Sequence, residues 1–144
     1  MKNYLRKIVV SGETYLWYRK HEHFDTSPGC TEVLTVFSQA SRKIPLRIRF
    51  RGADNATRQA AAGTWGVGYP ESGVLWFRQP NGDCGVKVNL NRPQVVAYFI
   101  RLMRGTQWRP TETRTPLVIE NGLALLDEHH QTLQETIGCC PRRF

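Results

Sequence analysis

The chain has 144 residues and a formal net charge of +8, and 40% of its residues are hydrophobic, a composition typical of a globular domain rather than a disordered chain. A chain of this length buries about 68% of the surface that its unfolded form exposes, so it can fold without a metal or disulfide bonds. Because no apolar run reaches the ~18–20 residues that span a bilayer and no secretory leader is visible, we expect a cytoplasmic protein with no membrane partner.

The first half of the chain predicts four β-strands. Two β-prone runs at residues 7–10 and 14–18 flank a turn that contains Gly12, which predicts a hairpin, and residues 31–38 are rich in β-branched and aromatic side chains. The clearest periodic signal is at residues 44–51, where apolar residues alternate with arginines as in a half-buried strand. We expect its apolar residues to lie inward (Ile44, Leu46, Ile48 and Phe50) and its arginines to form one outward stripe (Arg47, Arg49 and Arg51).

The middle of the chain predicts a loop followed by a second hairpin. Residues 52–72 contain several Gly, Ala and Pro residues and no core-forming period, so we expect a loop there. Residues 74–78 and 86–90 predict two strands joined around Asn81-Gly82, a favoured turn dipeptide. The connection is longer than two residues, so a β-bulge is expected.

The principal helix is expected at residues 91–105. Asn91 can cap it, Pro93 suits the first turn because its missing N–H costs nothing there, and Gly105 suits the end. Apolar residues recur at the spacing of a buried stripe, and Val96, Phe99, Ile100 and Met103 are expected to be buried.

The last segment predicts a strand or tight hairpin at residues 116–126, around Asn121-Gly122, and a short helix at residues 129–137. Together the elements indicate an α+β fold: a single domain at residues 1–127 with a mainly antiparallel sheet of about five to seven strands and the principal helix on one face. Residues 128–144 are expected to form a C-terminal extension, with the short helix followed by a basic tip.

Two segments resemble a group of small bacterial proteins for which no activity is known. The first is the run from Lys7 to Arg19, with an apolar strand, a turn and then Tyr-x-Trp. The second is Asn91-Arg92-Pro93 at the start of an apolar helix that ends near Gly105 and is followed by Trp108-Arg109-Pro110. The resemblance implies an α+β fold and a bacterial cytoplasmic origin, and it implies no mechanism.

No known catalytic or metal-binding motif is present. The four cysteines, at positions 30, 84, 139 and 140, contain no Cys-x-x-Cys pair, and no histidine is near Cys84 in the sequence to activate it as a nucleophile. His21 and His23 would share one face of a strand and could supply half a metal shell, with Cys30 or the C-terminal cysteine pair completing it, but this spacing matches no recognised site. We therefore expect no catalytic residue, cofactor or metal.

Fifteen of the twenty basic residues are arginine, whose planar fork suits carboxylates and phosphates. A sheet face with both arginines and aromatics is our candidate binding face, formed by Arg47, Arg49, Arg51, Trp17, Trp76 and Arg78. The primary hypothesis is a non-enzymatic interaction protein that binds another protein or a second copy of itself through this face. The alternative is a nucleic-acid-binding accessory protein that uses the same face, and an enzyme of unknown reaction is the third hypothesis. In the plainest interpretation, the aromatics are core and the arginines form a solvated face. A further alternative is that acidic side chains of neighbouring strands, Glu32 and Glu13, neutralise the arginines within the fold.

Overall fold

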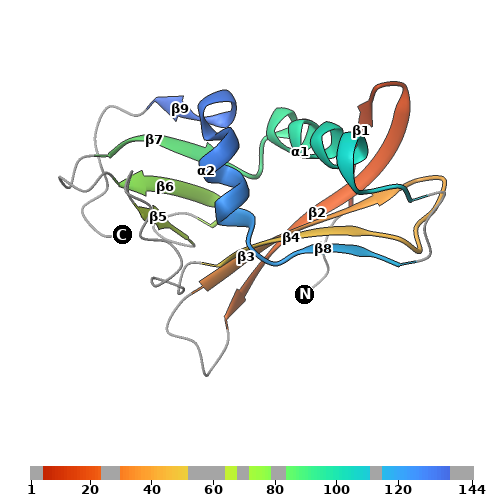
Figure 1. Cartoon of the computed structure of the whole chain (residues 1–144), viewed down its shortest axis with the longest axis horizontal. Helices are drawn as coiled ribbons and strands as arrows, with labels where there is room; N and C mark the ends of the chain where they lie inside the picture. Colours follow the sequence, from red (N-terminus) through yellow and green to blue (C-terminus); the bar gives the residue numbers. More distant parts are fainter. Residues whose placement is uncertain are drawn as a thin grey trace.

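The structure is a computed structural model that describes residues 5–23, 30–51, 64–67, 72–78, 84–110 and 115–136. It confirms the α+β class with mainly antiparallel strands. The described strands form two sheets rather than the single sheet expected, and a second helix accompanies the principal one (Figure 1).

The first sheet has the strand order β1-β2-β3-β4-β8. Its members are β1 (Arg6–Val10), β2 (Glu13–His23), β3 (Cys30–Ser38), β4 (Leu46–Arg51) and β8 (Leu117–Ile119). All neighbours pair antiparallel except β8, which runs parallel to β4. The predicted β1–β2 hairpin is confirmed, and its turn residues Ser11 and Gly12 both have positive φ angles, of 52° and 80°, as a two-residue hairpin turn favours.

The second sheet has the order β5-β6-β7-β9 and contains the second predicted hairpin. Its strands are β5 (Thr64–Gly66), β6 (Val74–Arg78), β7 (Cys84–Asn89) and β9 (Glu135–Thr136). The predicted bulge is present where the register shifts between Phe77 and Arg78. The expectation of a loop throughout residues 52–72 was wrong for β5, which pairs antiparallel with β6. The centroids of the Trp65 and Phe77 rings are 4.9 Å apart, and this contact holds the short strand against β6.

The predicted principal helix is confirmed as α1 (Pro93–Thr106). The four residues expected to be buried in it are buried, and they pack into the core that α1 shares with the first sheet. The helix continues one residue beyond Gly105, and its N-cap is Arg92, without a side-chain cap. Asn91 does not cap it because its amide binds Arg19 and Ser72 instead.

The second helix, α2 (Gly122–Leu133), occupies the second half of the strand or hairpin expected at residues 116–126, whose first half contains the strand β8. The side chain of Asn121 accepts a hydrogen bond from the backbone N–H of Ala124 and so starts a helix rather than a hairpin. A Cβ atom at Gly122 would lie 2.7 Å from the Arg49 carbonyl oxygen, so glycine lets α2 begin directly against β4. The helix starts earlier than the one expected at residues 129–137, and the domain boundary expected after Asp127 falls inside it.

Both helices lie on the same side of the first sheet (Figure 1). Side chains from β1–β4 on this side form the core with α1 and α2, and Leu46, Ile48 and Phe50 of β4 are completely buried there, as predicted. No described helix covers the opposite face of the first sheet. We call this opposite face, which contains the alternate residues of β1–β4, the open face.

Candidate functional site

The arginine stripe lies on the open face. Because Leu46, Ile48 and Phe50 point into the core, the alternation of β4 places Arg47, Arg49 and Arg51 on the other side. Their side chains are only partly covered: those of Arg49 and Arg51 are 27% and 52% exposed. The stripe therefore has the position that the sequence predicted for it.

The stripe forms one wall of a groove that follows β3. The strand register places Thr35 between Tyr18 and Arg47, Val33 between Lys20 and Arg49, and Thr31 between Glu22 and Arg51. The three β3 residues are short and buried, while the residues of β2 and β4 beside them are long. The hollow has a volume of about 170 Å³ and is lined by Tyr18, Lys20, Glu22, Val33, Thr35, Arg47 and Arg49. Each β3 residue and its two neighbours on β2 and β4 form one row of the groove, named after the β3 residue. We call the three rows together, including Thr31 and Arg51, the β3 groove.

The arginine stripe is neutralised only loosely within the described part of the chain. Glu120, which follows β8, lies 3.7 Å from Arg49 Nε and 3.8 Å from Arg51, and its own side chain is 60% exposed. These distances exceed hydrogen-bond length, and Arg49 Nε is a buried donor without a hydrogen-bond partner among the described residues. The suggestion that Glu32 or Glu13 neutralises the stripe was wrong, since both lie on the core side, where they bind Arg19 and Arg104.

The expected tryptophans are absent from the open face. Trp17 is 2% exposed and packs in the core, with the Arg6 guanidinium 4.6 Å from its ring centroid. Trp76 is buried in the second sheet, where Lys87 lies 5.3 Å from its ring. Arg78 also belongs to the second sheet, and its side chain lies outside the described residues. Placing Trp17 and Trp76 with the arginine stripe was therefore wrong, because both rings are buried elsewhere.

The aromatic residues that do share the open face are Tyr18 and Phe37. They lie on neighbouring strands, with ring centroids 6.3 Å apart and an interplanar angle of 29°. Both are half-buried, and each ring uses one of its faces against the other. Alternation along β2 could have identified Tyr18, because Trp17 and Tyr18 cannot point to the same side of a strand.

The sequence analysis missed a buried carboxylate on the core side. Glu32 has no exposed surface, and its oxygens bind Arg19 Nη1 at 2.7 Å and His21 Nδ1. Arg19 Nε also donates to Asn91 Oδ1 at 2.7 Å, and Asn91 in turn binds the Ser72 carbonyl oxygen. This cluster joins the first sheet to the connections on either side of β6 and β7. The sequence signal for this carboxylate was the position of Glu32, which alternates in phase with the apolar residues Leu34 and Val36.

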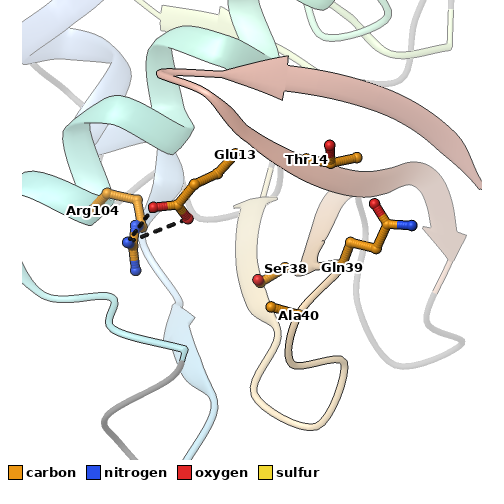
Figure 2. A pocket seen from close by; sticks show the side chains of 6 residues that line it. All are labelled: Glu13, Thr14, Ser38, Gln39, Ala40 and Arg104. Carbon is orange, nitrogen blue, oxygen red and sulfur yellow. Dashed lines mark hydrogen bonds and ion pairs between the residues drawn. The ribbon is translucent and has the colours of Figure 1, made fainter.

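A second polar hollow surrounds an ion pair at the end of α1. Glu13 and Arg104 line two adjoining hollows of about 470 and 450 Å³, and Arg104 Nη2 lies 3.1 Å from Glu13 Oε1 (Figure 2). The buried hydroxyl of Tyr15 donates to Glu13 Oε2 at 3.0 Å, and burial together with this bond raises the pKa of Tyr15 to about 12. Since Arg104 and Glu13 are paired with each other, Arg101 is the one other charged residue that lines these two hollows.

A third hollow, of about 330 Å³, lies between α1 and the end of α2. It is bounded by the ion pair of Arg92 with Glu135 at 2.8 Å, and Tyr98, which also lines it, is hydrogen-bonded to His129 Nδ1 at 2.6 Å. Arg92 and Glu135 are paired with each other, and Arg101 is the other charged residue that lines this hollow. The β3 groove differs because more cations stand together in it, with Lys20, Arg47 and Arg49 lining it beside Glu22.

The described side chains contain no group of three or more His, Cys, Asp or Glu residues that could hold a metal ion. His21 binds Glu32, and the register pairs His23 with Cys30, whose side chains lie outside the described set. The side chain of Cys84 and the whole of Cys139 and Cys140 also lie outside it.

Comparisons with protein-family models, with curated proteins and with solved structures found no match. Among the described residues, no helix has the length and apolar character needed to cross a membrane. The functional argument therefore depends on the geometry of the candidate sites themselves.

Proposed function

We propose that the chain is a non-enzymatic, cytoplasmic interaction protein whose open face binds an anionic segment of another protein. The supporting observation is the β3 groove, where four cations (Lys20, Arg47, Arg49 and Arg51) stand against two carboxylates of the described residues, those of Glu22 and of the more distant Glu120. Three arginines at a spacing of about 6.5–7 Å repel one another, and an anionic partner relieves this repulsion.

A protein partner is favoured over single-stranded nucleic acid by the state of the aromatic residues. Sheets that bind single strands offer exposed aromatic rings on which the bases stack. Here the two aromatics of the open face stack on each other, while Trp17 and Trp76 are buried elsewhere. Arginine forks remain suited to carboxylates, which a protein segment supplies.

A different protein is favoured over a second copy of this chain. Two copies joined through their open faces would bring two arginine stripes together, and like charges in contact weaken association. The formal net charge of +8 adds to this repulsion over the whole surface.

The experiment measures binding of fluorescent polyglutamate to three full-length proteins by anisotropy at several salt concentrations. These are the wild type, the triple variant Arg47→Gln/Arg49→Gln/Arg51→Gln and a control triple variant Arg92→Gln/Arg101→Gln/Arg104→Gln. The control removes the same charge from α1 and its N-cap, on the opposite side of the first sheet.

We expect the open-face variant to bind about ten-fold more weakly than the wild type, since each exposed charge contact contributes about 0.5 kcal/mol, while the control changes by less than about two-fold. An equal loss in both triple variants would show that only the net charge matters and would overturn the proposal. Tighter binding of an oligonucleotide than of polyglutamate, lost in the same open-face variant, would favour the nucleic-acid hypothesis.

A further inference from the structure

We infer that the partner segment is an extended acidic strand that lies along the β3 groove and presents two carboxylates at positions i and i+2. This inference rests on the proposed function and specifies its ligand. It follows from three features of the groove: its width, the spacing of its cations and the order of its charges.

The width of the groove suits one extended chain. Its walls stand on β2 and β4, which are separated by β3 alone, so their backbones are about 9–10 Å apart. Its floor is covered by the side chains of the two walls, because Val33 and Thr35 beneath them are only 4% and 1% exposed. A ligand therefore lies in the groove rather than entering the protein.

The spacing of the cations matches the side-chain repeat of an extended peptide. Same-face residues of a strand are about 6.5–7 Å apart, and this distance separates Arg47 from Arg49 on β4. A peptide aligned with β4 points its residues i and i+2 toward the groove with the same interval. Carboxylates at i and i+3 would point to opposite sides, so only one of them could reach an arginine.

The order of charges limits the acidic positions to two. The Thr35 row has one cation, Arg47, and the Val33 row has two, Lys20 and Arg49. In the Thr31 row, Glu22 stands opposite Arg51, so a third carboxylate would meet an anion as well as a cation. The strand should therefore carry carboxylates at the first two rows and a neutral residue at the third.

The unmet bonding capacity of the wall supports this assignment. Glu120 stays 3.7 Å from Arg49 and 3.8 Å from Arg51, so it forms a hydrogen bond with neither guanidinium group, and the Arg49 and Arg51 side chains are 27% and 52% exposed. Arg47 takes part in no ion pair within the described ranges. A peptide carboxylate with two oxygens can form the paired bonds to an arginine fork that Glu120 does not form.

The experiment uses two capped eight-residue peptides of identical composition, each with two glutamates among threonines. One has Glu at positions i and i+2 and the other at i and i+3. Each is titrated at low salt into the isotope-labelled full chain, with backbone amide shifts read by NMR. A single-stranded oligothymidylate is the third probe, and the proteins are the wild type, Arg49→Gln and the control Arg101→Gln on α1.

The expected result is that the i, i+2 peptide binds about five-fold more tightly than the i, i+3 peptide, because it places one more carboxylate on a cation. The shifts should centre on Val33, Thr35 and Arg47, and Arg49→Gln but not Arg101→Gln should remove the preference.

Other outcomes overturn the inference and separate it from the proposed function. Equal binding of both peptides in the groove would overturn the i, i+2 geometry and leave the proposed function standing. Groove shifts with oligothymidylate and not with either peptide would replace both with nucleic-acid binding. No groove shift with any of the three probes would overturn both.

Discussion

Gly73 shows how a single backbone position controls the buried cluster around Glu32. Its φ angle is +82°, and a Cβ atom there would lie 2.4 Å from Arg19 Nε and 2.7 Å from Asn91 Nδ2. Glycine thus meets two requirements at once: a left-handed backbone and a close approach of the Arg19 side chain. The cluster depends on both, because a methyl group would displace Arg19 Nε, which donates to Asn91, on the same guanidinium group that binds Glu32 through Nη1.

The two requirements can be separated with a matched pair of variants. Gly12 has nearly the same φ angle, +80°, but a Cβ atom there would have open space around it. We expect Gly12→Ala to lower the free energy of unfolding by about 1–2 kcal/mol, the cost of a left-handed backbone alone. Gly73→Ala should cost about 1.5–3 kcal/mol more, because it also disrupts hydrogen bonds of a charged group. Urea unfolding measures both values, and equal losses would contradict the close approach.

The raised pKa of Tyr15 predicts that the folded protein loses stability at alkaline pH. Its folded-state pKa, about 12, is above the ordinary value of 10.0, first because of burial and second because of the hydrogen bond to Glu13. The unfolded chain therefore loses this proton at a lower pH than the folded chain, so the stabilising contribution is complete below pH 10 and decreases between pH 10 and 12.

The measurement is the difference in unfolding free energy between the wild type and Tyr15→Phe as a function of pH. The difference should be constant below pH 10 and should shift in favour of Tyr15→Phe as the pH rises toward 12. Titration of the other tyrosines and of lysines affects both proteins alike and cancels. A difference that stays constant up to pH 12 would contradict the raised pKa.

At the scale of elements, α1 is the main source of the core on the helix side of the first sheet. Phe99 has no exposed surface, and its ring centroid lies 5.9 Å from that of Phe50 on β4. We expect Phe99→Ala to lower the free energy of unfolding by about 3–5 kcal/mol, the usual cost of truncating a buried aromatic residue. Arg101→Ala, at an exposed position of the same helix, should change it by less than about 0.5 kcal/mol.

Denaturant unfolding of the two variants tests the assignment of helix faces. A loss below about 1 kcal/mol for Phe99→Ala would mean that the stripe does not face the sheet. A large loss for Arg101→Ala would mean that the opposite side of α1 is covered as well.

The sequence predicted the elements whose signals are local. Alternation in residues 44–51 depends only on whether a strand has one buried face, and the stripe of α1 only on the helical period. The positions that were wrong depend on distant partners. Asn91 looked like a cap, but Arg19 binds it from 72 residues away. Alternation put Trp17 and Tyr18 on opposite sides, but only the packing of α1 determined which side became the core.

The same distinction explains the segment around Asn121. Asn-Gly suits both a hairpin turn and the start of a helix, since asparagine can occupy a left-handed turn position or cap a helix. The tertiary contact of Gly122 with the β4 backbone decides for the helix. The groove also could not be predicted from the sequence, because it requires the pairing order of β2, β3 and β4.

At the scale of the whole molecule, both described helices lie on one side of the first sheet, opposite the open face. α2 begins against β4 and continues to the second sheet, where Trp65 donates to Asp127 at 2.8 Å. The Arg19–Asn91 bond is a second connection between the sheets. With both sheets tied together on the helix side, the open face can accept a partner without rearrangement of the core.

Glu120 lies beside the arginine stripe, and we propose that it competes with an anionic partner for this stripe. It follows β8, precedes α2, and lies 3.7 and 3.8 Å from Arg49 and Arg51. An exposed pair at such distances contributes about 0–1 kcal/mol, so its removal should cost little stability. We expect Glu120→Gln to tighten polyglutamate binding by up to about five-fold, since the stripe then keeps its full charge for the partner.

Glu128→Gln is the matched control for this prediction. It makes the same change in net charge on α2, where the Glu128 side chain is 75% exposed, and α2 lies on the helix side of the first sheet. Long-range attraction should increase similarly in both variants and should disappear as salt is added. The additional gain of Glu120→Gln should persist at salt concentrations that abolish the effect of Glu128→Gln, because release of the contact with Arg49 and Arg51 is local. If anisotropy titrations give the two variants the same affinity at every salt concentration, Glu120 does not compete for the stripe, and Arg49 and Arg51 do not form the binding wall of the β3 groove.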